Sequence, residues 1–397
     1  WSSDVCSSDL NCSAKQVDSS RHPLLTQATT KTWGADSTRL LKTDFRNQRE
    51  KPMKFDFLKK ASAVAATAAM AFSLSAMDAE AGKKVRWKMH SAFGTNLAVI
   101  GPVGPRVADA VRAMSGGDFD IKVFEPGALA GGYAYYDPIS QGAFDAAYGT
   151  PGANQGKNSA LAFASSWPFG PGVGEFLAWL KYGGGEEIIS EIYARDNIKF
   201  HMCGMISPET SGWFREPIES LDQLKGLKMR FFGMGAKVMQ KFGVSTQQLA
   251  GGDIYPALEL GTIDATEFSM PAIDRSLGFY QIAKYNYFPG WHQQATTNEI
   301  LVNMDKWNAL PDEYKAMFET ACAMNIAYEI ADGEASQFEA MIANEADGVK
   351  NMVWPDEILD QLRAAWDEVV QEEIASNPDA QKLWASYTEF NAKYKVR

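Results

Sequence analysis

The stretch "FDIKVFEPGALAGGYAYYDPISQGAFDAAYG", residues 119–149, decides the fold class of this chain. Its first residues alternate apolar and polar side chains, which is the pattern of a half-buried strand, and a Pro-Gly turn follows at residues 126–127. The second half of the stretch combines a short helix, a glycine and another strand. A strand, a helix and a second strand in this order predict helices packed on a largely parallel sheet.

The same order of elements extends outward in both directions. Residues 84–92, "KVRWKMHSA", alternate in the same way and predict a strand. The second half of residues 96–117 predicts a helix that ends at a glycine pair. Further along, residues 220–232 and 251–268 each combine a short helix, a glycine and a strand. Two regions of similar organisation, each about one small domain long, predict two α/β lobes.

From Met304 onward the sequence is mainly helical. Residues 310–349 keep a helical period for about ten turns, which is long enough for one helix to brace both lobes. Residues 355–396 predict two more amphipathic helices.

The segment before residue 82 is expected to lie outside the mature protein. Residues 1–10, "WSSDVCSSDL", match the translation of a common sequencing-adapter oligonucleotide, so we interpret residues 1–52 as adapter and upstream translation that is not native. Residues 53–81 combine a lysine-rich start, an apolar stretch of small residues and the motif "AEA", which together predict a signal peptide. The apolar stretch is shorter than the ~20 residues of a membrane-spanning helix. We therefore predict secretion.

Charge and motifs argue against several classes of protein. The net charge of -11 disfavours nucleic acid as a partner. The histidines, including His90, His201 and His292, have no Cys or His at metal-ligand spacing, so a zinc site is not expected. The sequence shows no nucleophile elbow, complete dinucleotide fingerprint or P-loop, which lowers the expectation of an enzyme. The cysteines of the mature chain, Cys203 and Cys322, fit either one disulfide bond or two buried thiols.

Several stretches together resemble one protein family. In order along the chain they are "GALAGG" (127–132), "WPFG" (167–170), "SGWFREPIESLDQLKGLKMRF" (211–231), "GGDIYPALELGTIDATEF" (251–268), "LGFYQIAKYNYFPGWHQ" (277–293) and "LPDEYK" (310–315). The ordered set is similar to the DctP-type solute-binding proteins of tripartite ATP-independent periplasmic (TRAP) transporters. It is most similar to the branch that binds 2-oxo acids or lactate together with a metal ion, and the resemblance covers nearly all of residues 83–397.

This resemblance implies an α/β, two-lobed periplasmic binding protein with a ligand cleft between the lobes and long helices that cross the hinge. Lobe I would comprise residues 82–207 and 296–335, and lobe II residues 208–295 and 336–397 with the C-terminal helices. The protein would capture a small monocarboxylate as the lobes close and deliver it to the membrane subunits of a TRAP permease, without being an enzyme.

The resemblance also bears on the oligomeric state. Some relatives in this branch dimerise by exchanging a C-terminal helix, and the helices after Pro355 are long enough for such a homodimer. The alternative is a terminal helix packed on its own chain.

The resemblance further implies a carboxylate site and a metal site. Arg230 matches the arginine that holds the ligand carboxylate through two parallel hydrogen bonds. Glu209, Phe268 and Gln293 match the metal-binding positions, where the branch usually has glutamine, tryptophan and glutamate. The position of Phe268 contributes its backbone carbonyl. The carboxylate has thus moved from position 293 to position 209 and the amide has moved the other way, which preserves the charge and the oxygen ligands that a hard cation needs.

A charge count favours sodium over calcium at this site. Arg230 and a sodium ion bring two positive charges, and Glu209 and a ligand carboxylate bring two negative charges, so the closed site is neutral. Calcium would leave one positive charge unless Glu267 also faces the site.

The wall contributed by the first lobe departs from the related branch, which usually has adjacent aromatic residues there. By their spacing from "WPFG", Gly152 and Ala153 stand at these positions, and a smaller wall predicts a longer or branched 2-oxo or 2-hydroxy acid. Tyr133, Tyr136 and Asn154 are further candidates for lining this side of the ligand.

Two other functions are compatible with the sequence. A metal-dependent enzyme would act on a 2-oxo acid with Glu209 as its base. A ligand-sensing protein would report the acid to a sensor kinase instead of delivering it to a permease.

Overall fold

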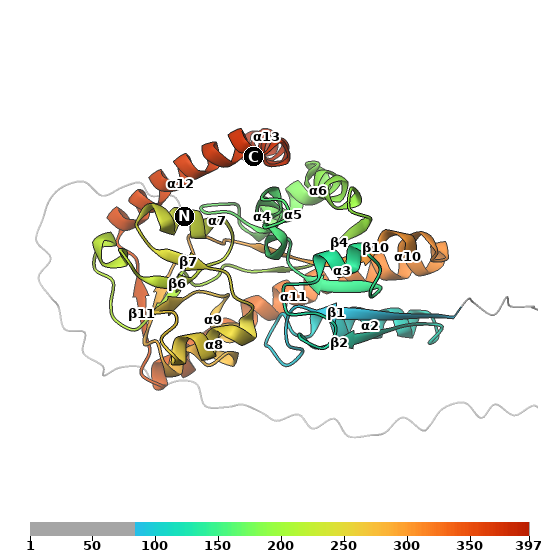
Figure 1. Ribbon diagram of the computed structural model, residues 1–397, viewed down its shortest axis with the longest axis horizontal. Helices are drawn as coiled ribbons and strands as arrows, with labels where there is room; N and C mark the ends of the chain where they lie inside the picture. The colour runs from blue at the N-terminus through green and yellow to red at the C-terminus, as the bar shows by residue number, and fades with distance from the viewer. Residues whose placement is uncertain (1–83, 397) are drawn as a thin grey trace, which may run out of the picture. The chain divides into compact units, whose positions relative to one another are not determined.

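The computed structural model describes residues 84–396, which form two α/β lobes (Figure 1). The predicted adapter region, 1–52, and the predicted signal peptide, 53–81, lie outside the described residues. Within the described part of the chain, no helix is long and apolar enough to span a bilayer.

Lobe I is built on a five-stranded sheet, of which only the pairings among β1, β2 and β3 are parallel as the opening stretch of the sequence predicted. In spatial order its strands are β2 (Phe119–Phe124), β1 (Val85–Ser91), β3 (Ala146–Gly149), β10 (Thr296–Asn303) and β4 (Ile198–Ile206). β1 is parallel to β2 and β3, whereas β10 is antiparallel to β3 and β4. Because β10 joins this sheet only after most of lobe II has been built, the sheet of lobe I is made of two separate segments of the chain.

The helices of lobe I cover this sheet. They are α2 (Val103–Met114), α3 (Tyr136–Ser140), η1 (Pro151–Asn154), α4 (Ala160–Ser165), α5 (Val173–Tyr182), α6 (Gly185–Ala194) and α10 (Met304–Asn308). In α2, the apolar residues Val103, Val107 and Val111 recur at helical spacing and are fully buried, so this face packs against β2.

Lobe II has a six-stranded sheet of shorter strands. In spatial order they are β11 (Lys350–Val353), β9 (Tyr285–Phe288), β5 (Gly212–Phe214), β8 (Ala265–Thr266), β6 (Lys228–Arg230) and β7 (Ser245–Gln247). The helices of this lobe are η2 (Leu221–Leu224), α7 (Gly233–Lys241), α8 (Gly251–Glu259), α9 (Pro271–Ser276) and η3 (Phe279–Gln281). β6 is parallel to both β7 and β8, so the C-terminal ends of β6 and β8 lie at the same edge of the sheet.

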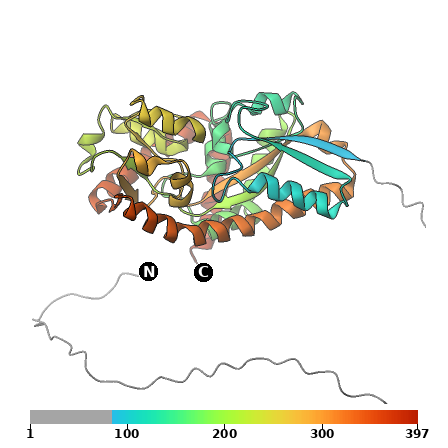
Figure 2. The same ribbon diagram turned by 90° about the horizontal axis from the view of Figure 1, so that it is seen from below.

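One helix crosses the hinge, as predicted. α11 (Asp312–Ala346) packs against β4 and α2 in lobe I and against α9 and β11 in lobe II. Figure 2 shows it in orange beneath both lobes. Cys203 in β4 and Cys322 in α11 form a disulfide bond, which selects the first of the two alternatives that the sequence left open.

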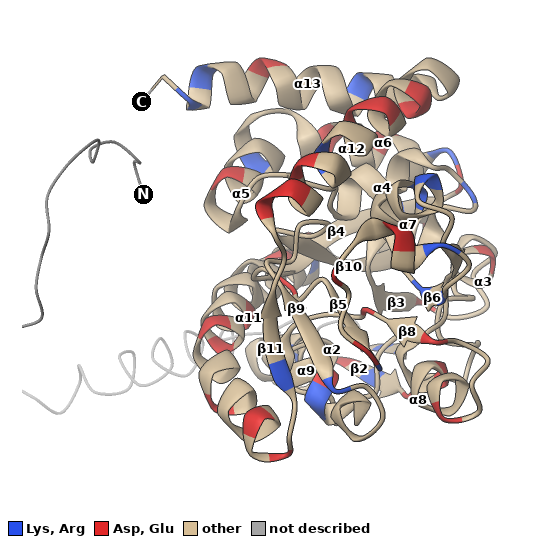
Figure 3. Cartoon of the chain, turned by 90° about the vertical axis from the view of Figure 1, so that its left-hand side faces the viewer, with Lys and Arg blue, Asp and Glu red and all other residues tan. Residues whose placement is uncertain are grey.

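The last two helices divide between the lobes. α12 (Asp356–Ser376) packs on α7, where Lys241 contacts Glu368 and Glu372, and Figure 3 shows acidic residues along α12. α13 (Pro378–Tyr394) packs instead on α4, α5 and α6 of lobe I. The domain boundaries derived from the resemblance assigned this helix to lobe II. It lies on lobe I because its apolar face, with Leu383 buried, covers the aromatic cluster around Trp167 there.

Candidate ligand and metal site

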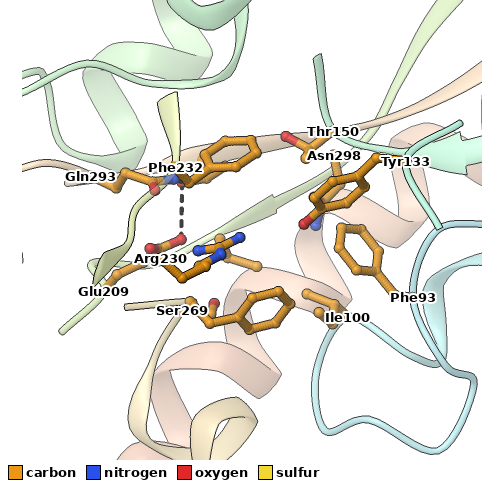
Figure 4. Close-up of a pocket in the computed structure, with 13 residues that line it drawn as sticks. Phe93, Ile100, Tyr133, Thr150, Glu209, Arg230, Phe232, Ser269, Gln293 and Asn298 are labelled. Atoms are coloured by element: carbon orange, nitrogen blue, oxygen red, sulfur yellow. Dashed lines mark hydrogen bonds between the residues drawn. The ribbon is translucent and has the colours of Figure 1, made fainter. Parts of the chain in front are cut away.

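A small cavity of about 30 Å³ lies where the two lobes meet (Figure 4). Both lobes contribute side chains to its wall. The lining residues are Phe93, Ile100, Tyr133, Thr150, Ile206, Glu209, Arg230, Phe232, Phe268, Ser269, Gln293, Thr296 and Asn298. Of the residues predicted from the sequence, Tyr133, Glu209, Arg230, Phe268 and Gln293 therefore come together in one place.

Arg230 is the last residue of β6 and only 1% exposed. Its Nη1 donates to the carboxylate of Glu267 at 2.7 Å and to the Glu267 backbone carbonyl at 2.8 Å. Its Nε donates to the carbonyl of Leu249 at 3.2 Å. Because these bonds use Nε and both hydrogens of Nη1, Nη2 is the nitrogen whose hydrogens remain for a ligand.

Aromatic rings surround this guanidinium group. The Arg230 Cζ lies 5.1 Å from the ring centroid of Phe268 and 5.6 Å from that of Phe232. Burial raises the pKa of Tyr133 to about 12, against the opposing effect of Arg230 beside it. Tyr133 therefore stays a neutral hydroxyl that can donate a hydrogen bond into the cavity.

Two carboxylates and an imidazole form a buried cluster beside Arg230. The Nε2 of His292 lies 3.6 Å from Oε2 of Glu209 and 3.4 Å from Oε2 of Glu267. Glu209 stands in the loop between β4 and β5, Glu267 follows β8, and His292 follows β9, so three neighbouring strand ends supply the cluster. One potential ligand atom from each residue lies within 4.8 Å of the others, which is a spacing that can hold a metal ion.

The charges of this cluster shift one another's ionisation. Burial raises the pKa of Glu209 above its usual value, although His292 opposes this effect. Burial also works against ionisation of Glu267, but Arg230 and His292 hold the pKa of that carboxyl below its usual value. Burial would lower the pKa of His292, yet the two carboxylates beside it raise that pKa, so the imidazole keeps its proton at neutral pH.

Buried atoms without hydrogen bonds show that these residues fit a cation. Within residues 84–396, no hydrogen-bond partner is found for Oε2 of Glu209, Oε2 of Glu267 and Oε1 of Gln293. Buried polar atoms are nearly always satisfied, and the His292 imidazole beside the two carboxylate oxygens, at 3.6 and 3.4 Å, forms no hydrogen bond with them, so the three oxygens are available as ligands. Carboxylate and amide oxygens are the ligands that sodium and calcium prefer.

Thr296 orients the amide of Gln293 towards this cluster. The Nε2 of Gln293 donates to Oγ1 of Thr296 at 2.7 Å, and Oγ1 of Thr296 donates to Oε1 of Glu209 at 3.3 Å. The amide nitrogen is thereby occupied, and the amide oxygen is left for a cation. Second contacts of this kind commonly fix metal ligands in position.

Two predicted residues do not reach the cavity wall. Asn154 donates to Oε1 of Glu299 at 3.1 Å inside lobe I, next to Tyr193. Tyr136 donates to Asp196 at 2.6 Å. Phe268 does line the cavity with its ring, and a metal contact through its carbonyl stays a prediction.

The sequence did not identify His292 or Phe232 as site residues. His292 has no Cys or His at metal-ligand spacing, so the pattern does not predict it as a ligand, but its partners are carboxylates that are distant in sequence and lie at neighbouring strand ends. The only signal was its place next to Gln293 in "GWHQ". Phe232 is the second residue after β6, and its ring fills the space beside Gly152 that the sequence predicted to be open.

Comparisons with known proteins agree on one family. Residues 103–377 match the family model described as bacterial extracellular solute-binding protein, family 7 (DctP). A monocarboxylate 2-oxoacid-binding periplasmic protein of Nostoc sp. is 34% identical over 307 residues, which is 77% of this chain and 84% of the relative.

Two solved structures share the fold over most of their length. A TRAP transporter solute-binding protein of Bordetella bronchiseptica is 34% identical with a TM-score of 0.77, covering 79% of this chain and 93% of that one. It is described as a mixed-occupancy dimer with copurified calcium and picolinate in one site. A TRAP periplasmic solute-binding protein of Pseudoalteromonas atlantica with bound sodium and pyruvate is 27% identical with a TM-score of 0.75, covering 79% and 96%.

Proposed function

This chain belongs to the bacterial extracellular solute-binding proteins of family 7 (DctP), and from that membership we propose that it captures a small 2-oxo or 2-hydroxy monocarboxylate together with a metal ion. It would then deliver the acid to the membrane subunits of a TRAP permease. The observation that carries this proposal is the buried Arg230 in the cavity between the lobes, next to unsatisfied oxygens of Glu209, Glu267 and Gln293.

Arg230 and Tyr133 are the groups suited to the ligand carboxylate. A carboxylate beside Arg230 can accept from Nη2 and from the Tyr133 hydroxyl, which both face the cavity. The sequence predicted two parallel hydrogen bonds from Arg230 to the ligand carboxylate. We propose this different arrangement because Glu267 already accepts both hydrogen bonds of Nη1. Glu267 therefore holds the guanidinium in one orientation before the ligand arrives, which lowers the entropy cost of binding.

Glu209, Gln293 and Glu267 are the residues that would hold the metal ion, and the ion would bind the ligand's oxygens at the same site. With both carboxylates ionised, Arg230 and His292 balance Glu209 and Glu267. A sodium ion and a ligand carboxylate add no net charge, so the filled site stays neutral, as a buried site requires. Glu267 does face the site, but the charge of His292 offsets it, and the count still favours sodium over calcium.

Membership of this family also bears on enzyme activity, location and assembly. The family's members bind solutes, which supports a binding protein rather than an enzyme, and its named relative is periplasmic. We infer a periplasmic location for this chain. A homodimer formed through the helices after Pro355 stays a prediction, since α13 here packs on its own chain.

A ligand screen tests the proposed function. Purified protein is dialysed against chelator and heated with a panel of monocarboxylates, each with sodium, with calcium or with neither. A 2-oxo or 2-hydroxy acid at a hundredfold excess over Kd is expected to stabilise the protein by about 2.7 kcal/mol, and a metal ion is expected to strengthen the effect. Absence of any stabilisation across the panel with both cations would contradict the proposal. Mass analysis of the acids after incubation would detect turnover and so separate binding from catalysis.

A further inference from the structure

We propose that Phe232, received by Gly152 across the cleft, limits the length of the acid that this site accepts. The ligands would be short, unbranched 2-oxo or 2-hydroxy monocarboxylates of about three or four carbons, since the closed cavity has room for few atoms. This inference rests on the proposed function and adds the chain length of the ligand to it.

The backbone of Phe232 is held in place from within lobe II. Its amide donates to Oε1 of Glu267 at 2.5 Å, and the same oxygen accepts from Arg230 at 2.7 Å. Phe232 also stands directly before α7, whose first residue is Gly233. The ring therefore cannot leave the cavity wall through a shift of the backbone unless the bonds to Glu267 break.

The ring stands beside the groups proposed to bind the carboxylate. Its centroid lies 5.6 Å from Cζ of Arg230 and 6.3 Å from the ring centroid of Tyr133, and the side chain is buried. Figure 4 shows the ring above Arg230, extending towards Thr150 of lobe I. An acid held by Arg230 thus meets the Phe232 ring within a short distance of its carboxylate.

Gly152 is the residue that admits this ring on the opposite lobe. A Cβ atom at position 152 would lie 2.6 Å from Cε1 and 2.7 Å from Cζ of Phe232, distances that carbon atoms do not adopt without displacement. Ser165 Cβ would also lie only 3.1 Å away, so the added atom is crowded by two side chains. The closed cleft therefore needs glycine at position 152 as long as Phe232 is present.

The small size of the cavity favours the shortest of these acids. Its volume of about 30 Å³ corresponds to roughly two water positions, at about 10–15 Å³ for each. Glycine at position 152 without a ring opposite would leave a longer space, as the sequence alone predicted. The ring of Phe232 fills that space, and a long or branched acid would have to hold the lobes apart.

Titration calorimetry with a series of straight-chain 2-oxo acids of three to six carbons tests the inference. The unchanged protein is expected to bind the short acids and to lose affinity steeply as the chain lengthens. Phe232→Ala is expected to shift the preference towards the longer acids, by about 10- to 200-fold for each methylene group that the new space accepts. Phe214→Ala is the matched control, because that buried ring of lobe II contacts Tyr287 and Trp354 instead, and it should keep the original length preference.

A second pair of variants tests the contact between the lobes. Gly152→Ala should weaken binding of every acid at least tenfold, because the methyl group and the ring cannot share the closed state. The double variant Gly152→Ala, Phe232→Ala should regain most of that loss, which a double-mutant cycle measures as coupling.

The outcomes separate the two proposals. An unchanged length preference in Phe232→Ala, or normal binding by Gly152→Ala, would overturn the role of this pair while leaving acid binding intact. A parent protein that binds none of the acids would overturn the proposed function and this inference together.

Discussion

Glu267 accepts a hydrogen bond from Arg230 at 2.7 Å, and both side chains are withdrawn from water, with exposed fractions of 0% and 1%. Glu267 is the last acidic residue of "DATEF", and Arg230 ends the neighbouring parallel strand. This bond thus joins two residues that are 37 positions apart in sequence, at the wall of the ligand cavity.

Removing one partner of this buried ion pair should destabilise the fold. Glu267→Gln leaves the charge of Arg230 without its counter-charge, and we expect the free energy of unfolding to fall by about 3–5 kcal/mol. Urea denaturation at neutral pH measures the change. Glu389→Gln is the control, because the pair of Glu389 with Lys393 is exposed and its loss should not change stability measurably. Equal stability of the two variants would contradict the structural role of Glu267.

Arg230 and Tyr133 should contribute unequally to ligand binding. Arg230→Ala is expected to weaken acid binding by about 2–5 kcal/mol, since the ligand charge loses its partner in a buried site. Arg230→Lys should weaken binding less, and Tyr133→Phe should cost about 1.5–3 kcal/mol as one hydrogen bond to a charged group is lost. Calorimetry on variants shown to be folded by circular dichroism provides the measurement. Near-normal affinity in Arg230→Ala would remove this residue from the ligand site.

Exchanging the side chains of Glu209 and Gln293 tests whether both positions bind the same cation. Glu209→Gln alone removes a charge from the cation site and Gln293→Glu alone adds one, so each should weaken or distort metal-dependent binding. The double variant restores the charge, and its binding in sodium should lie closer to that of the parent than either single variant does. The sodium dependence of acid affinity is the quantity to compare. Additive losses in the double variant would show that the two positions do not share one ion.

A buried carboxyl in lobe I should make stability depend on pH. Burial raises the pKa of Glu299 to about 8, so the folded protein keeps this proton at pH values where the unfolded chain has released it. The resulting stabilisation is fully present below the unfolded pKa of about 4.3 and is lost as pH rises towards about 8. Between these values the unfolding free energy falls by up to about 1.4 kcal/mol for each pH unit, because the folded state binds about one proton more than the unfolded chain.

Glu299→Gln isolates this effect. The amide oxygen can still accept from Tyr193, which donates to Oε1 of Glu299 at 3.0 Å, but the side chain no longer ionises. Between about pH 5 and pH 8 we therefore expect a shallower fall of the unfolding free energy than in the parent. Parallel pH profiles from chemical denaturation would show that Glu299 does not carry the dependence.

The repeated order of strands and helices was enough to predict both lobes, because alternation at a period of two and apolar spacing at a helical period are local properties. The long hinge helix was predictable for the same reason. β8 shows the limit: the sequence predicts a strand through residues 262–268, whereas only Ala265–Thr266 pair, since the chain turns at Glu267 to meet Arg230.

The site could be predicted only where a residue type carries its own chemistry. Arg230 and Glu209 were predicted because they match the ligand-binding and metal-binding positions of the family that the sequence resembles. His292 acquires its role from two carboxylates that the fold brings close, and no spacing in the sequence reports such a contact. At Gly152 the sequence predicted too much space. The small residue suggested an open wall, but the ring of Phe232, which is distant in sequence, fills that space.

The bond between Cys203 and Cys322 closes a loop of 119 residues and fastens β4 to the helix that crosses the hinge. Bonds of this kind persist outside the reducing cytoplasm, and a disulfide typically stabilises a protein by about 2–4 kcal/mol. The redox conditions of the expression host therefore affect every stability measurement on this protein, because they decide whether this disulfide forms. Material made in a reducing cell interior would carry a looser hinge than material exported to an oxidising one, and the two preparations would differ in melting temperature before any ligand is added.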